Sequence, residues 1–318
     1  NMVLNTGHSL LPTFHGDPKN PIIVLLHGWL GCTQDWETTL DYLAPNFFCI
    51  CIQLPGHTYD DYEEVNEMFE NCLTPYFEPS VLSNPRLLTD PDHEITLSRW
   101  HHNGCAAIEL NQTNEDVFDI FSDLLLDMLF PFKGKKISFI GYSMGGRFLL
   151  HFMKKYPSVV DKVILESTNF GITSKQERLN RWESDIKYAR SLIKNPSTFF
   201  DKWYDAELWG PIKKDSEYPI LIDRRHLNTP IFCAQSLLLF SLAFQSPFLP
   251  AHLDELGTSK TSTILLIHGE GDDKYRTLFE TYSEKNSRIS RYMVGQGHHN
   301  THFSHPRVFS RAVLDFLS

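Results

Sequence analysis

Six short runs of apolar or β-favouring residues recur along the chain. Pro21–Leu26, with the sequence PIIVLL, is apolar throughout. A fully apolar strand is buried on both faces, as in a parallel or mixed sheet covered by helices. The runs predict strands at Pro21–Leu26, Phe47–Leu54, Ile137–Ile140, Val163–Leu165, Thr263–Ile267 and Arg291–Val294.

Helical periodicity appears between these strands. Between Asn114 and Leu129 one face is apolar, and Asn114 before two acidic residues suits a helix start. The positions on that face are Val117, Ile120, Phe121, Leu124, Leu125 and Met128. Further helices are expected at Trp36–Leu43, Phe148–Met153 and Val308–Leu317. Strands that alternate with helices indicate an α/β fold of doubly wound type.

Two segments interrupt this alternation. Residues 58–113 open with acidic side chains, are rich in proline and lack sustained periodicity, so we expect an insertion, with one helix at Tyr62–Cys72. Its histidines, at 93, 101 and 102, show no ligand spacing, and we predict no metal site. Residues 171–245 are rich in charge and aromatics and lie between two core strands, which predicts a helical cap. The expected division is a core at 1–170 and 246–318, with the cap between them.

Composition limits the partners. The chain is 42% hydrophobic and 21% charged, as in soluble globular proteins, and its net charge is −10. That charge argues against nucleic acid or an anionic membrane as the main partner, although a few converging arginines can still bind an anion. No apolar run approaches the ~20 residues of a membrane span. Six cysteines without CxxC spacing suggest reduced thiols, with Cys49 and Cys51 as packing residues, in a cytoplasmic protein without a cofactor. The oligomeric state is left open.

The strongest motif follows the strand that ends near Ile140. Gly141-Tyr142-Ser143-Met144-Gly145 has the form G-x-S-x-G, and a helical pattern begins directly after it. Strand, G-x-S-x-G and helix together form the context of a nucleophile elbow, whose sharp turn exposes the serine hydroxyl. The motif alone also occurs by chance in long chains, so its partners matter.

Those partners occur at the ends of other predicted strands. His27-Gly28-Trp29-Leu30-Gly31 has the composition of a loop that supplies an oxyanion-hole amide, and Asp272 follows a core strand. A histidine motif then comes last, at residues 298–302. The order Ser, Asp, His predicts the α/β-hydrolase fold, a mostly parallel sheet flanked by helices with a helical cap. Either His298 or His299 can complete the triad, and the spacing to His302 and Pro306 favours His299.

Longer motifs resemble one family, the 2-succinyl-6-hydroxy-2,4-cyclohexadiene-1-carboxylate (SHCHC) synthases of menaquinone biosynthesis. The matching pieces span core and cap, and GYSMGGR and ERLNRWESD are the most specific of them. The others are LHGWLG, LPGH, the WY pair at 203–204, SLAFQ, GEGDDKYR and HNTH. The segment near 58–113 is much longer than this family's connection there, and Gln53 stands where an aspartate usually precedes LPGH.

The resemblance implies roles for individual residues. It makes Ser143, Asp272 and His299 the triad, and the amides of Trp29 and Met144 the oxyanion hole. It implies substrate binding by Tyr142, Arg147, Arg181, Trp203, Tyr204 and Arg225. Members of this family eliminate pyruvate from a cyclohexene that carries three carboxylates, with the serine as a base, so the resemblance implies an anionic small-molecule substrate. Three arginines suit three carboxylates, because each guanidinium offers a forked donor.

Two other functions fit the same motifs. An ordinary serine hydrolase of an ester, thioester or carbon–carbon bond would use Ser143 as a nucleophile and form an acyl-enzyme. A catalytically silent binding protein would keep only the fold. Converging cations at Arg147 and Arg181 favour the lyase over a hydrolase of neutral esters, and the complete triad argues against a silent protein.

Overall fold

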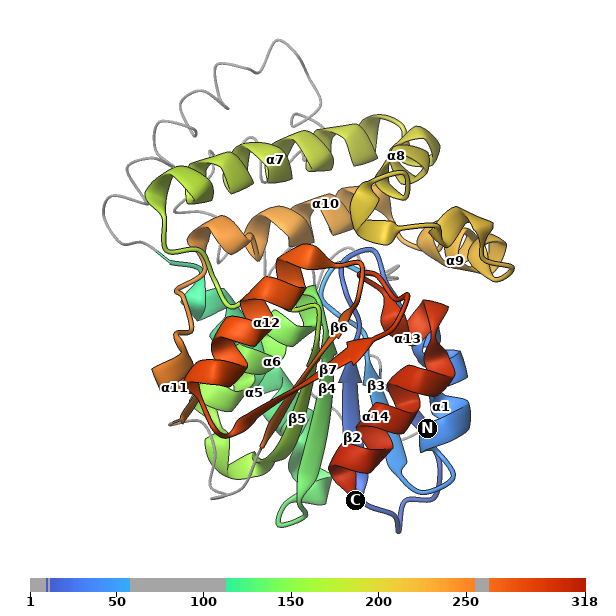
Figure 1. Cartoon of the computed structure of the whole chain (residues 1–318). Coiled ribbons are helices and arrows are strands. Elements are labelled where there is room, and N and C mark those ends of the chain that lie inside the picture. Colours follow the sequence, from blue (N-terminus) through green and yellow to red (C-terminus); the bar gives the residue numbers. More distant parts are fainter. Residues whose placement is uncertain (1–9, 11, 58–112, 255–262) are drawn as a thin grey trace.

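The computed structural model describes residues 10, 12–57, 113–254 and 263–318. At its centre is a seven-stranded sheet in the order β1-β3-β2-β4-β5-β6-β7, in which only β1 is antiparallel to its neighbour (Figure 1). The strands are β1 (Thr13–His15), β2 (Ile22–Leu26), β3 (Phe48–Ile52), β4 (Ile137–Tyr142), β5 (Val160–Glu166), β6 (Ile264–Gly269) and β7 (Ile289–Val294). The predicted mostly parallel sheet is confirmed.

Burial explains why the central strands are apolar. Every residue of β2, β3, β4 and β6 is buried, because helices cover both faces of the sheet. Along β2, Ile23 and Leu25 join one hydrophobic cluster while Ile22, Val24 and Leu26 join the other. Cys49 and Cys51 are buried packing residues of β3, as predicted. The sequence did not reveal β1, which is three residues long and largely exposed.

The two faces are covered by different helices (Figure 1). One cluster joins the sheet to α1 (Glu37–Leu43) and α14 (Pro306–Leu317). The other joins it to α5 (Glu115–Leu129), α6 (Met144–Lys155) and α12 (Asp273–Lys285). Short helical turns connect these elements, at Thr33–Trp36, Phe130–Phe132, Pro157–Val159, Pro250–Asp254 and Thr301–Ser304.

The predicted helix after Asn114 is present, with two differences. Its buried face includes Phe118, whereas Ile120 is 39% exposed because it lies at the margin of the apolar stripe. The Asn114 side chain does not cap the helix. Its amide instead donates to the carbonyls of Leu239 and Ser241, at 3.2 and 2.9 Å, and so ties the start of α5 to the end of α10 (Pro230–Leu239).

Four helices lie over the carboxyl-terminal edge of the sheet (Figure 1). They are α7 (Lys175–Lys194), α8 (Pro196–Trp203), α9 (Tyr218–Arg225) and α10, with short turns at Glu207–Trp209, Ile212–Lys214 and Leu242–Phe244. We call this group the cap. Its bounds as a separate unit, 171–245, stay a prediction. The insertion, with its expected helix at Tyr62–Cys72 and its histidines, lies outside the described residues.

In the described part of the chain, no single helix has the length and apolarity needed to cross a membrane. One bent pair, Tyr218–Arg225 with Pro230–Phe244, meets the length and composition criteria jointly, with an 84° bend between its halves.

Candidate active site

The elbow is built as the motif predicts. Strand β4 ends at Tyr142 and α6 begins at Met144, which leaves Ser143 between them with φ 50° and ψ −113°. A positive φ is strained for a residue with a side chain. A Cβ on Gly145 would lie 2.3 Å from the carbonyl oxygen of His27, so only glycine lets strand β2 pass this close.

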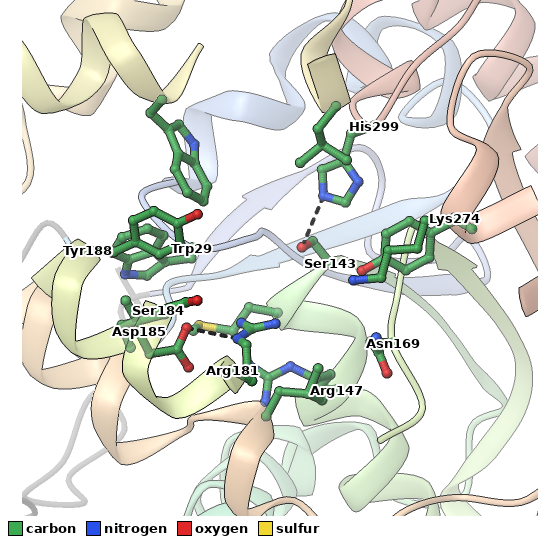
Figure 2. A pocket seen from close by; sticks show the side chains of 16 residues that line it. Trp29, Ser143, Arg147, Asn169, Arg181, Ser184, Asp185, Tyr188, Lys274 and His299 are labelled. Carbon is green, nitrogen blue, oxygen red and sulfur yellow. Dashed lines mark hydrogen bonds and ion pairs between the residues drawn. The ribbon is translucent and has the colours of Figure 1, made fainter. Parts of the chain in front are cut away.

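Ser143, His299 and Asp272 form a hydrogen-bonded chain, although 156 and 27 residues separate the partners. Figure 2 shows its contact between Ser143 and His299. The His299 Nε2 lies 3.3 Å from the Ser143 Oγ, and its Nδ1 lies 3.1 Å from the Asp272 Oδ2. Asp272 follows β6, and its other carboxylate oxygen accepts the Tyr275 N–H at the start of α12. His299 and Asp272 are both buried. This geometry suits a serine whose proton passes to histidine.

A buried carboxylate holds the loop that carries His299. Glu166, at the end of β5, accepts the Thr301 N–H and hydroxyl, both at 2.7 Å, and the His302 Nδ1–H at 2.6 Å. His298 lies elsewhere. A Cβ added at Gly210 or Gly271 would come within 2.5 Å of its ring, and it lines a second cavity. Of the two adjacent histidines, His299 is the one that reaches both Ser143 and Asp272.

A cavity of about 300 Å³ opens beside Ser143. Seven of the predicted site residues line it, namely Trp29, Ser143, Met144, Arg147, Arg181, Trp203 and His299. The lining also includes residues that we did not predict, among them Asn169, Asp185, Tyr188, Lys274 and Tyr275. Three of the lining side chains are cations, on α6, α7 and α12. The described residues contain no cluster of three or more His, Cys, Asp or Glu side chains that could hold a metal ion.

Arg147 lies one turn after Ser143 and is 4% exposed. One guanidinium nitrogen donates to the carbonyl of Phe240 at 2.6 Å and to the Gln245 Oε1 at 3.2 Å. Among the described residues, no carboxylate forms an ion pair with it. Burial, together with the neighbouring charge of Arg181, lowers the pKa of Arg147 to about 9. Asp185 lies near enough to raise that pKa in part, but a buried cation without an ion-pair partner is costly and favours an anion nearby.

Arg181 reaches the cavity from α7. Its Nε donates to the Asp185 Oδ1 at 2.8 Å, and the other oxygen of Asp185 accepts the Ser241 hydroxyl at 2.7 Å. The pair is one helical turn apart, and Asp185 is fully buried. Asp185 therefore orients Arg181, and no described residue bonds the remaining guanidinium nitrogens. Figure 2 shows Arg147 and Arg181 on the same side of the cavity.

Lys274 is the third cation. It lies in the first turn of α12, two residues after Asp272, and Figure 2 shows its side chain extending towards the cavity. The residue as a whole is exposed, but partial desolvation of its ammonium group, with a contribution from Arg181, lowers the pKa of Lys274. In the described structure no carboxylate forms an ion pair with it. Its position two residues after the expected triad acid could have identified it from the sequence. The arginine motifs drew attention away from it.

Three of the predicted binding residues are not among those that line the cavity. Tyr142 is buried, with its ring against His302 at 4.7 Å between centroids. The hydroxyl of Tyr204 accepts the Arg225 Nε–H at 2.8 Å. Arg225 is neutralised by Asp35, since its Nη1 lies 3.1 and 2.9 Å from the two carboxylate oxygens. An arginine held in this way is not free for a substrate carboxylate.

The loop that contains Trp29 is fixed by two buried histidines. The Leu30 N–H donates to the His57 Nε2 at 2.9 Å, and the Leu54 N–H donates to the His27 Nε2 at 3.1 Å. These ring nitrogens accept, so both imidazoles are neutral. Burial lowers the pKa of His27 to about 4 and holds that of His57 well below its usual value. These two hydrogen bonds thus join the HGWLG turn to the LPGH turn.

Buried neutral histidines predict a loss of stability in acid. His151 is a third one, stacked on Phe118 with ring centroids 3.9 Å apart, and its pKa is lowered to about 3 by burial, with Arg147 adding to the effect. Below pH 6.5 the unfolded chain protonates these groups and the folded chain does not. Each should therefore remove about 1.4 kcal/mol of unfolding free energy per pH unit, down to its folded-state pKa.

The matched variant is His151→Phe, which keeps an aromatic ring on Phe118 and removes one titrating group. Urea unfolding between pH 6.5 and 4.5 should show a pH slope that is smaller than that of the unchanged chain by about one proton, or 1.4 kcal/mol per pH unit. Identical slopes would mean that His151 is not held neutral in the folded state.

Comparison with known proteins agrees with this architecture. The family model described as alpha/beta hydrolase fold matches residues 21–208. A Bacillus subtilis (strain 168) protein provisionally named 2-succinyl-6-hydroxy-2,4-cyclohexadiene-1-carboxylate synthase is 26% identical, over all of this chain and 98% of that protein. An Escherichia coli O9:H4 (strain HS) protein with the same synthase name is 24% identical, over 95% of this chain and 96% of its own length.

Solved structures show the same fold. MenH from S. aureus superposes with a TM-score of 0.71 at 21% identity, over 96% of this chain and 97% of that one. A bromoperoxidase from Bacillus anthracis superposes with a TM-score of 0.65 at 15% identity, over 96% and 94%. The fold therefore does not select one chemistry. The resemblance to SHCHC synthases is confirmed across the whole chain, and the chain belongs to the alpha/beta hydrolase fold family.

Proposed function

We propose that this chain is a carbon–oxygen lyase of the SHCHC synthase type. It eliminates pyruvate from 2-succinyl-5-enolpyruvyl-6-hydroxy-3-cyclohexene-1-carboxylate. Relatives that carry the synthase name support this assignment, and they align over nearly their full length. The observation that carries the proposal is Arg147, a buried cation that lines the cavity beside Ser143 and has no carboxylate partner among the described residues.

The charge of the cavity suits an anionic substrate. Arg147, Arg181 and Lys274 are cationic, and Asp185 offsets one of those charges. The proposed binding set leaves out Arg225, because Asp35 already pairs with it. Lys274 takes its place as the third cation, so three positive groups on three elements face a substrate with three carboxylates. Arginine binds a carboxylate through a planar fork, whereas lysine acts as a point charge.

Proton transfer begins at Ser143. The Nδ1–H of His299 donates to the Asp272 carboxylate, and its Nε2 lone pair accepts from the Ser143 hydroxyl. As His299 takes that proton, the serine oxygen removes the ring proton next to the succinyl ketone. The electron pair of the broken C–H bond moves to the ketone oxygen. The backbone amides of Trp29 and Met144, which flank Ser143 in the cavity lining, stabilise this developing oxyanion.

Elimination then follows without a covalent intermediate. The electron pair returns from the ketone oxygen through the conjugated system and breaks the bond between the ring carbon and the enolpyruvyl oxygen. Enolpyruvate leaves, takes up one proton and becomes pyruvate, and the ring keeps a new double bond. The proton taken from the ring returns to solvent through Ser143 and His299. Ser143 is thus a base, and no acyl-enzyme forms.

Removing the cavity cations should distinguish a lyase that acts on a tricarboxylate from a general hydrolase that acts on neutral esters. Arg147→Ala, Arg181→Ala and Lys274→Ala should each lower kcat/KM for the tricarboxylate by about 10- to 100-fold, because a charge-assisted hydrogen bond in a partly desolvated site contributes about 1.5–3 kcal/mol. A small neutral ester should be indifferent to all three changes. The measurement is kcat/KM for both substrates with each variant.

Arg276→Ala is the matched control. Arg276 lies on the same helix as Lys274, is partly exposed, does not line the cavity, and pairs with the exposed Asp273. It should leave both reactions unchanged. If the tricarboxylate proves no more sensitive than the ester to loss of the three cations, the lyase assignment fails and only the fold assignment remains.

A further inference from the structure

A buried ion pair joins the cap to the core. Arg225, at the end of α9, contacts both carboxylate oxygens of Asp35, which lies in the short helix Thr33–Trp36 after the Trp29 loop. The side chains are only 5% and 7% exposed. The Nε of Arg225 is also used, because it donates to Tyr204. The pair is thus largely buried, and Tyr204 holds Arg225 on its other side.

Asp35 holds the backbone of the loop that contains Trp29. Its Oδ2 accepts the Cys32 N–H at 3.3 Å, and a Cβ on Gly31 would come within 2.8 Å of the same oxygen. The loop is strained at this point, because Leu30 has φ 68°. Such a residue persists only where its surroundings over-determine it. Asp35 and Arg225 provide part of that constraint.

Two further hydrogen bonds join the cap to the same loop. Asn228, three residues after Arg225, donates to the carbonyl of Leu30 at 2.7 Å. The indole N–H of Trp29 donates to the carbonyl of Cys233, in α10, at 2.8 Å. The segment from the end of α9 into α10 therefore bonds the Leu30 carbonyl and the Trp29 side chain. Neither Arg225 nor Asn228 is among the residues that line the substrate cavity.

We propose that Arg225 is a positioning residue for the reaction: through Asp35, and together with Asn228, it fixes where the Trp29 amide points. This inference rests on the proposed role of that amide in stabilising the oxyanion. It replaces the substrate-binding role that the family resemblance implied. The amide is needed in the transition state and not for substrate binding, so the loss of Arg225 should appear in kcat. It should also affect any reaction that uses the same oxyanion site.

The test compares two reactions in four variants of the full chain. The reactions are elimination from the tricarboxylate and hydrolysis of 4-nitrophenyl acetate. Arg225→Met/Asp35→Asn removes both charges, so that no unpaired charge stays buried. Arg225→Lys keeps the charge without the fork, and Asn228→Ala loosens the loop without any change of charge. Arg224→Met is the matched control, because Arg224 links the same helix to Glu37 of α1 and not to the loop.

In the double variant, kcat should fall by about 10- to 100-fold in both reactions, as expected for a displaced donor, while KM stays within about threefold. Arg225→Lys should recover part of kcat, Asn228→Ala should lower kcat with KM unchanged, and Arg224→Met should leave both constants unchanged. A rise in KM for the tricarboxylate alone would make Arg225 a substrate ligand and overturn the inference. A lower melting temperature with unchanged kcat would show that Arg225 has a purely structural role, which would also overturn the inference.

The design separates this inference from the proposed function. If the unchanged chain hydrolyses the ester but releases no pyruvate, the lyase assignment fails, and the ester kcat of the double variant still decides the role of Arg225. If elimination proceeds without ester hydrolysis, the kcat and KM of elimination decide it. Inactivity of the unchanged chain in both reactions would overturn both proposals.

Discussion

Replacing Ser143 with alanine is expected to lower kcat for pyruvate elimination by about four to six orders of magnitude, as loss of a triad serine does elsewhere. The Ser143 Oγ is the atom that would carry the proton from the ring to His299, which lies 3.3 Å away. Alanine keeps the strained backbone of the elbow and removes only the hydroxyl. The melting temperature and the affinity for pyruvate, measured by calorimetry, should therefore stay close to those of the unchanged chain.

The same serine separates the two mechanisms. A hydrolase would form an acyl-enzyme on Ser143, and rapid quenching followed by mass spectrometry would detect the added mass. The lyase mechanism predicts no adduct during turnover of the cyclohexene substrate. A covalent acyl group on Ser143 would refute the role of the serine as a base and make the chain a hydrolase.

Loss of His299 should be nearly as severe. We expect His299→Ala to lower kcat by about 10⁴-fold or more, because Ser143 then has no base and Asp272 has no imidazole to orient. His298→Ala is the matched control. His298 lies against Gly210 and Gly271 and away from Ser143, so its loss should change kcat by less than about tenfold. The two variants differ by one position in the same loop.

Steady-state kinetics of pyruvate release for both variants provide the measurement, with circular dichroism to verify folding. If His298→Ala is the more damaging change, the assignment of His299 as the triad base is wrong. Equal losses in both variants, with folded protein in each, would show that the loop acts as a unit and that His299 is not specifically required.

Features determined by local sequence could be predicted. Strand β2 is recognisable because burial on both faces leaves only apolar residues. The elbow is recognisable because its sharp turn requires glycine: a Cβ on Gly141 would meet Gly146, five residues on, and one on Gly145 would meet the chain at the end of β2. Strand β1 was missed because it is short and half-exposed, so burial imposes no pattern on it. Helix α12 carries its buried Tyr275, Phe279 and Tyr282 at helical spacing, among many charges that obscured the pattern.

Pairings between distant residues could not be predicted. The sequence gives no sign that Arg225 pairs with Asp35, which is 190 residues away, and the motif alone suggested a substrate ligand. Nor does it show that Asp185 orients Arg181, or that Lys274 faces the same cavity. Adjacent residues in an irregular loop point in different directions, so the choice between His298 and His299 also required the fold. Whether a cation in a motif binds substrate or pairs within the protein can be decided only when the acidic residues near it in the fold are known.

The most direct test of the central claim is pyruvate release by the purified chain. We expect one pyruvate for each molecule of 2-succinyl-5-enolpyruvyl-6-hydroxy-3-cyclohexene-1-carboxylate consumed, followed by coupling to lactate dehydrogenase, at a rate that Ser143→Ala reduces to the uncatalysed background. Release no faster than that background, or release that Ser143→Ala does not slow, would contradict the proposed lyase activity.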